Sequence, residues 1–171
     1  CEVYVQSSAG KLSGFSDLSY KDSGGTIINN LDQSIWSEAD LIFCVQTPSA
    51  DNLTKLKKGA VLLGLLDPYG NKELLRVINN NKISALSLEL LPRISRAQSS
   101  DVLSSQANIA GYKAVLLAAS ELDRYFPMLM TAAGTVQPAK VVVLGGGVAG
   151  LQAVATAKRL GALVFVSDIR P

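Results

Sequence analysis

The sequence predicts an α/β fold with two parallel-sheet lobes joined by a long helix, and three observations support this class. Short apolar runs alternate with helical or turn-like stretches from Glu2 to Leu90. A long helical pattern follows from Val102 to Tyr125, and the chain then closes with a strand, a glycine turn, a helix and a second strand. Continuous apolar strands that alternate with helices are typical of parallel sheets covered by helices.

Residues 1–98 are assigned to the first lobe, which we expect to be Rossmann-like and related to the flavodoxin type. Its predicted strands are Val3–Val5, Thr26–Ile28, Leu41–Val45, Ala60–Leu66 and Ile83–Leu88. Its predicted helices are Phe15–Lys21, Leu31–Glu38, Asn52–Lys57 and Leu74–Asn80. Segments rich in Gly, Pro, Asn, Asp and Ser separate these elements, as turns require.

Residues 99–130 are assigned to the connecting long helix and a hinge. Ser99 or Ser100 is the expected N-cap, and Asp101 in the first turn interacts favourably with the helix dipole. Gly111 lies in the middle of the helix, where it costs about 1 kcal/mol relative to Ala. A glycine at that position indicates close packing against another element.

Residues 131–171 are assigned to the start of a second lobe, a β-α-β unit of the Rossmann type. The apolar run Val141–Leu144 enters a turn with glycines at Gly145, Gly147 and Gly150. A helix begins near Val148, and a second apolar run leads to an acid. We expect the first strand and helix of the first lobe, and the remainder of the second lobe, to be missing, so that the fold is truncated at both ends.

The glycine turn has the features of a pyrophosphate-binding site. Gly145 permits the tight bend, Gly147 allows the backbone to approach a phosphate, and Gly150 allows close packing of helix and strand. The N–H groups at the helix start, which includes Val148 and Ala149, face the phosphates. The alternative is a structural β-α-β unit that binds no ligand.

Asp168 lies 18 residues after Gly150, close to the roughly 20 expected of the acid that binds an adenosine ribose 2′-hydroxyl. A carboxylate there repels a 2′-phosphate, so NAD is favoured over NADP. Ile169 and Arg170 adjoin it and complete the predicted nucleotide site, and Arg170 is the one residue that argues for NADP.

Composition excludes several other functions. Hydrophobic residues make up 48% of the chain and charged residues 18%, which is enough for a substantial core. The net charge of +2 is too small to indicate nucleic acid or an anionic membrane as a partner. Without histidine, and with only Cys1 and Cys44, no metal site is expected. Cys44 is interpreted as an ordinary core residue of a protein from a reducing compartment, and no apolar run is long enough to span a bilayer.

A polar loop precedes the long helix. Arg93, Arg96, Gln98, Asp101 and Ser104 fall within twelve residues, and the last three recur at intervals of three. Near a helix start, such residues point roughly the same way. Together they offer hydrogen bonds for a nicotinamide amide and its ribose hydroxyls. The alternative is a solvated loop with a helix cap.

Several segments of the chain closely resemble the NAD(H)-binding component of proton-translocating nicotinamide nucleotide transhydrogenase, a relative of alanine dehydrogenase. They are LLPRISRAQSSDVLSSQANIAGYKAVLLAA, FPMLMTAAGTVQPAKVVVLGGGVAGLQAVATAKRLGA, VFVSDIRP, GFSDLSYKDSGGTI and LKKGAVLLGLLDPYGNKELL. The resemblance covers essentially the whole chain, and the LPRISRAQ…D run is the part specific to this family.

The resemblance implies a fold and a set of site residues. The family's domain I, in the α subunit, has two Rossmann-like lobes joined by long helices, with NAD(H) in the cleft. The loop that orients the nicotinamide and its ribose falls on Arg93, Gln98 and Asp101, with Ser104 as an adjoining contact. The family's ribose-binding acid falls on Asp168. These residues act without acid–base chemistry.

The resemblance also implies a reaction and partners. The reaction is reversible, Re/Si-specific hydride transfer between NAD(H) here and NADP(H) on a partner domain, coupled to proton movement across a membrane. The implied partners are a second copy in a homodimer, the NADP(H)-binding domain and the membrane domain. The implied location is the inner face of a membrane, on the bacterial cytoplasmic side or in an organelle, with no insertion by this segment.

The residues agree with this reaction, because hydride transfer between two nicotinamides exchanges no proton at the reacting carbons and needs ring positioning instead. Two alternatives stay open. One is an alanine or saccharopine dehydrogenase-like oxidoreductase, which as a family needs a histidine that GLLDPYG lacks. The other is a non-catalytic NAD-binding module.

Overall fold

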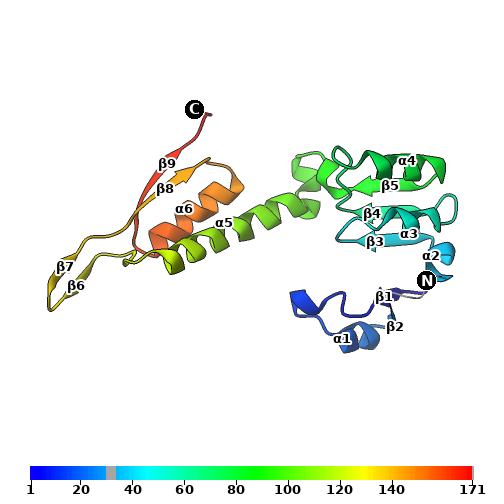
Figure 1. The fold of residues 1–171 in the computed structure, drawn as a ribbon, viewed down its shortest axis with the longest axis horizontal. Helices are drawn as coiled ribbons and strands as arrows, with labels where there is room; N and C mark the ends of the chain where they lie inside the picture. Colours follow the sequence, from blue (N-terminus) through cyan, green and yellow to red (C-terminus); the bar gives the residue numbers. More distant parts are fainter. Residues whose placement is uncertain (30–33, 171) are drawn as a thin grey trace. The chain divides into compact units, whose positions relative to one another are not determined.

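The computed structural model describes residues 1–29 and 34–170. The chain divides into two compact units, Cys1–Leu88 and Glu89–Pro171 (Figure 1). The predicted helix Leu31–Glu38 falls partly outside the described residues, since its first three positions belong to the gap.

The first unit alternates strands and helices in the predicted order. Its elements are β1 (Tyr4–Gln6), η1 (Lys11–Ser13), α1 (Asp17–Asp22), β2 (Thr26–Ile28), α2 (Ser34–Glu38), β3 (Leu41–Cys44), α3 (Ala50–Thr54), β4 (Val61–Gly64), α4 (Lys72–Asn80) and β5 (Ser84–Ser87), with the short turn η2 (Leu88–Leu90) at its end. Strands β1 and β2 form one parallel pair, and β3, β4 and β5 form a parallel sheet with β4 in the centre. The parallel-sheet class is therefore confirmed.

Local chemistry explains where several of these helices begin. Ser16, Ser49 and Asn71 precede α1, α3 and α4, and each side-chain oxygen accepts a hydrogen bond from a backbone N–H of the first turn. Such N-caps satisfy donors that have no partner within the helix. The polar segments between the apolar runs are thus the start signals of the helices.

A leucine-rich core holds the first unit together. Leu53 of α3, Leu62 of β4 and Leu66 are fully buried, and Leu74 and Ile78 of α4 complete the same cluster. Partly buried side chains pack against it, among them that of Cys44, as expected from its apolar surroundings in the sequence.

The second unit contains a long helix, a hairpin and a β-α-β unit. Its elements are η3 (Ser95–Ser100), α5 (Val102–Glu121), β6 (Leu129–Thr131), β7 (Gly134–Val136), β8 (Lys140–Leu144), α6 (Val148–Arg159) and β9 (Leu163–Ser167). Strands β8 and β9 are parallel, and α6 lies against both α5 and this strand pair. Val115, Phe126, Ala139, Ala157 and Ala162 form the core between them.

The predicted elements of this unit are largely confirmed, with two differences. Helix α5 ends at Glu121, four residues before the predicted end at Tyr125. The segment between the helix and β8, which we assigned to a hinge, contains the antiparallel hairpin β6–β7. Its strands are three residues long, too short for alternation to stand out from a loop.

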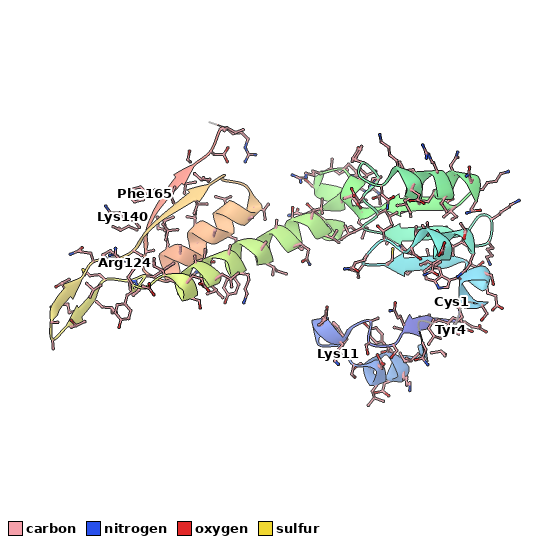
Figure 2. The ribbon with its side chains drawn as sticks, in the orientation of Figure 1. Cys1, Tyr4, Lys11, Arg124, Lys140 and Phe165 are labelled. Carbon is pink, nitrogen blue, oxygen red and sulfur yellow. The ribbon has the colours of Figure 1, made fainter. Side chains whose placement is uncertain are left out.

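One face of the β8–β9 pair has no helix over it among the described residues. Figure 2 labels Lys140 and Phe165 on these strands, and Phe165 pairs in register with Val142. The side chains of Val142 and Phe165 are more than half exposed. The β-α-β unit is thus packed on one face only in the part of the chain that the structure describes.

Two adjacent residues of α4 test the assignment of the core. Leu74 is 3% exposed and Leu75 is 42% exposed. We expect Leu74→Ala to lower the free energy of unfolding by about 2–5 kcal/mol, because it leaves a cavity, and Leu75→Ala to lower it by less than about 1 kcal/mol. Denaturant unfolding of both variants checks this, and equal losses would contradict the core assignment.

Candidate functional site

The turn after β8 is built from two backbone segments in contact. Gly145 has a φ of +100°, a left-handed conformation that favours glycine, and its N–H donates to the Ser167 carbonyl at 2.7 Å. A Cβ on Gly150 would overlap the Gly145 carbonyl oxygen and lie 3.5 Å from Val143 Cγ1. The bend at Gly145 and the close packing at Gly150 therefore both require glycine, as predicted from the motif.

Gly147 is different, because the described structure leaves space beside it. Its φ of −76° and ψ of −170° are ordinary extended values, and a Cβ there would meet no described atom within 4 Å. Gly147 is the N-cap of α6, a position that glycine accepts readily but where Ser, Asp or Asn is preferred. The open space fits a ligand that approaches the backbone closely.

The first turn of α6 offers hydrogen-bond donors to such a ligand. Val148 and Ala149 are its first residues, and their N–H groups have no partner within the helix. Gly147 has no side chain that caps them. Unpaired donors and the positive end of a twelve-residue helix together favour an anion, so this turn has the chemistry that a pyrophosphate group needs.

Asp168 lies beside the turn, where it is held by three groups. Its carboxylate accepts a hydrogen bond from the Gly146 N–H and another, at 2.8 Å, from the Arg170 N–H. The Arg170 guanidinium donates through Nε to Oδ1 at 3.2 Å and through Nη2 to Oδ2 at 3.3 Å. The predicted ribose-binding acid is thus at the turn, paired with a cation two residues away.

This pairing changes the titration of both residues. The Arg170 guanidinium holds the pKa of Asp168 far below its ordinary value of 3.8, and the N–H groups of Arg170 and Gly146 lower it further. Asp168 in turn raises the pKa of Arg170. Both groups are therefore charged at physiological pH, and Asp168 is a hydrogen-bond acceptor only. The side chain of Ile169, between them in sequence, is fully exposed.

The polar loop ends in a helix cap. Asp101 is the N-cap of α5, with Oδ1 accepting from the Ser104 N–H at 2.9 Å and Oδ2 accepting from Ser104 Oγ at 2.7 Å. The prediction of Ser99 or Ser100 as the N-cap was wrong, because the 3-10 turn η3 takes up both serines before the helix begins.

The charges of the loop interact with this cap. Hydrogen bonds from the backbone and side chain of Ser104 lower the pKa of Asp101, and the positive charge of Arg93 lowers it further. The Gln98 carbonyl accepts from the Asp101 N–H at 3.2 Å, and the residues Arg93, Arg96 and Gln98 are exposed. The structure therefore joins Asp101 directly to Ser104, while the other polar side chains of the loop face solvent.

Sequence reasoning missed the partners of Asp168. It treated Arg170 as a competing sign of NADP rather than as a partner of the acid, and it gave Gly146 no role. The signal was present as the Asp-Ile-Arg spacing, since a carboxylate readily binds the backbone N–H two residues on. Nothing in the spacing alone identifies the Gly146 N–H, which the fold brings there from 22 positions away.

Two other kinds of feature are absent from the described residues. Within residues 1–29 and 34–170, no group of three or more His, Cys, Asp or Glu side chains is arranged to hold a metal ion. In the same residues, no helix combines the length and the apolar character needed to cross a bilayer.

The chain matches two family models. Residues 1–110 match the N-terminal domain of alanine dehydrogenase/PNT, and residues 114–171 match the C-terminal domain of the same family. An NAD(P) transhydrogenase subunit alpha chain of Rhodospirillum rubrum is 48% identical over 174 residues, a match that covers 99% of this chain and 45% of that relative. The chain thus spans less than half the length of this relative.

Solved structures give the same order of similarity. A transhydrogenase from Sinorhizobium meliloti superposes with a TM-score of 0.91 at 48% identity, over 99% of this chain and 50% of that one. An L-alanine dehydrogenase superposes with a TM-score of 0.79 at 28% identity, over 99% and 46% of the two chains. The alanine dehydrogenase is the more distant of the two.

Replacement of Arg170 tests the pairing with Asp168. We expect Arg170→Ala to raise the pKa of Asp168 toward 3.8, because the largest cause of its depression is removed. An NMR titration of the aspartate carboxyl carbons measures this, with Arg159→Ala, an exposed arginine of α6, as the matched control. An unchanged pKa in Arg170→Ala would contradict the pairing.

The same pair links stability to pH. Because the folded pKa of Asp168 lies below its unfolded value, its contribution to the free energy of unfolding is present above about pH 4 and is lost as pH falls through the folded pKa. The difference in thermal midpoint between wild type and Arg170→Ala should therefore be largest near neutral pH and narrow in acid.

Proposed function

Because this chain belongs to the alanine dehydrogenase/PNT family, we propose that it forms the NAD(H)-binding part of a transhydrogenase α subunit. The whole enzyme would transfer a hydride reversibly between NAD(H) and NADP(H). The observation that carries the proposal is the open space at Gly147 beside the unpaired N–H groups of α6, with Asp168 at the adjoining strand end. That arrangement supports a dinucleotide whose pyrophosphate lies over the glycine turn.

Each part of the turn has a proposed task in binding NAD(H). The N–H groups of Gly147, Val148 and Ala149 would bind the pyrophosphate, and Asp168 would accept a hydrogen bond from the adenosine ribose. Since the Asp168 carboxylate already has three groups bound to it, Arg170 must give way in part or share its place with the ribose hydroxyl. The ionised carboxylate would disfavour the 2′-phosphate of NADP(H).

The polar loop has a proposed task at the other end of the dinucleotide. Arg93 and Gln98 carry exposed donors, and Asp101 and Ser104 form a small hydrogen-bonded pair at the start of α5. These groups would orient the nicotinamide and its ribose. The nicotinamide itself supplies the hydride chemistry, so this chain contributes orientation and no acid or base.

The proposed partners follow from the same family. We propose a homodimer that docks with an NADP(H)-binding domain and works together with a membrane domain, at the inner face of a membrane. Proton coupling and Re/Si specificity would belong to that assembly. The names of the transhydrogenase relatives support this proposal, because they describe α subunits of a larger enzyme.

The experiment that tests the proposal uses the full-length protein and an NADP(H)-binding partner domain. NADH and NADPH are titrated by fluorescence, and hydride transfer from NADPH to an NAD analogue is then followed without any amino acid. Preference for NADH together with transfer between cofactors supports the proposal. Transfer only after addition of alanine or pyruvate would instead indicate an alanine dehydrogenase-like enzyme, and binding without any transfer a non-catalytic NAD-binding module.

The role of Asp168 gives a specific prediction. We expect Asp168→Asn to weaken NADH binding by several-fold and to narrow the preference for NADH over NADPH, because a charged acceptor is replaced by a neutral amide. Fluorescence titration with both nucleotides measures the two effects. Asp123→Asn, an exposed acid of the same unit, is the control. Unchanged discrimination between the nucleotides would refute the ribose role.

The role of Gln98 gives another. We expect Gln98→Ala to lower the rate of hydride transfer by about tenfold or more while it changes NADH affinity less, because an orienting contact acts mainly on the reacting geometry. Gln137→Ala, an exposed amide of the same unit, should change neither quantity. A loss confined to NADH affinity would contradict the orienting role.

A further inference from the structure

Helices α5 and α6 touch through their backbones at one point. A Cβ on Gly111 of α5 would collide with the Ala149 carbonyl oxygen and lie 2.9 Å and 3.0 Å from the carbonyl carbon and Cα of the same residue. All three atoms belong to the main chain of α6, so no rotation of a side chain relieves the collision. In Figure 1 the two helices run side by side within the second unit.

The position of Ala149 gives this contact its meaning. Ala149 is the second residue of α6 and lies in the turn proposed to bind the pyrophosphate. Gly111 is buried in the middle of a twenty-residue helix, where glycine is about 1 kcal/mol less favourable than alanine. Since Gly111 has ordinary helical geometry, the available space explains glycine here and the backbone conformation does not.

A ladder of polar side chains fixes the same contact one turn away. Asn108 Nδ2 donates to Gln152 Oε1 at 3.2 Å, and Gln152 Nε2 donates to Thr156 Oγ1 at 3.3 Å. The buried Thr156 hydroxyl in turn donates to the Gln152 carbonyl at 2.8 Å. Asn108 precedes Gly111 by three residues and Gln152 follows Ala149 by three, so the ladder and the backbone contact lie on neighbouring turns.

The contact also bears on the polar loop, because α5 begins at Asp101. Gly111 lies ten residues along the helix, which corresponds to about 15 Å of axial rise. A continuous helix transmits its position along this length with little bending. The place where α5 meets α6 therefore sets the position of Asp101 and Ser104 relative to the glycine turn.

We infer that Gly111, Asn108 and Gln152 are positioning residues that set the spacing between the pyrophosphate turn and the loop that orients the nicotinamide. The inference rests on the proposed function. It assigns to the α5–α6 contact an effect on hydride transfer that exceeds its effect on stability, because a small displacement of bound reactants slows a reaction strongly.

Gly111→Ala in the full-length protein, assayed with the NADP(H)-binding partner domain, tests the inference. The added methyl group must shift the first turn of α6 relative to α5. We expect hydride transfer at saturating nucleotides to fall by about 10–100-fold, and the NADH dissociation constant to rise by a smaller factor. A purely structural role would leave the transfer rate at saturation unchanged.

Asn108→Ala is the second variant, and it keeps the test decisive if Gly111→Ala does not fold. Asn108 is exposed, so its loss should leave the thermal midpoint almost unchanged while transfer at saturation falls by about 2–10-fold. Gln106→Ala is the matched control, because this exposed amide of α5 makes no side-chain hydrogen bond among the described residues.

The outcomes separate the inference from the proposed function. Slower transfer in Gly111→Ala or Asn108→Ala, with Gln106→Ala like wild type, supports the positioning role. Wild-type transfer rates in Asn108→Ala and in a folded Gly111→Ala would overturn the positioning role and leave the proposed function intact. A wild-type protein that binds NADH but transfers no hydride would overturn the proposed function, and this inference with it.

Discussion

The first turn of α6 is held between two backbones, and the second unit depends on that constraint. On the sheet side, Gly150 lies against the Gly145 carbonyl, and on the helix side, Gly111 lies against Ala149. Both contacts exist only because a glycine brings no Cβ. The third motif glycine, Gly147, is in neither contact and lies beside open space. Two glycines of the turn and its neighbour on α5 thus serve packing, and one leaves the helix end accessible.

The chemistry of the site agrees with this rigid arrangement. The chain contains no histidine, and the described carboxylates of the site, Asp101 and Asp168, have lowered pKa values. Groups that stay ionised across the physiological range are poor general acids and bases, but they are constant hydrogen-bond acceptors. A reaction that needs two rings in register and no proton transfer fits such a site better than amino-acid oxidation does.

How much could be predicted from sequence depended on the range of the interaction. Periodicity and the glycine motif predicted the strands and helices, and the mid-helix Gly111 predicted close packing, because these signals are local. The partner of Gly111 was not predictable, since Ala149 is distant in sequence and any small residue would have fitted equally well. Asp101 and the two serines before it are comparable N-caps, so propensity alone did not decide where α5 begins. The short hairpin β6–β7 left no periodic signal.

The pairing of Asp168 with Arg170 has a kinetic consequence. An isolated carboxylate beside the turn would repel the phosphates of an approaching dinucleotide, whereas the ion pair carries no net charge. The positive end of α6 then dominates the local field, and incoming anions are attracted to the turn before any ribose contact forms. Because the guanidinium is largely exposed, added salt screens its attraction for the carboxylate. The rate of nucleotide capture is therefore set by ionic strength as well as by the shape of the turn.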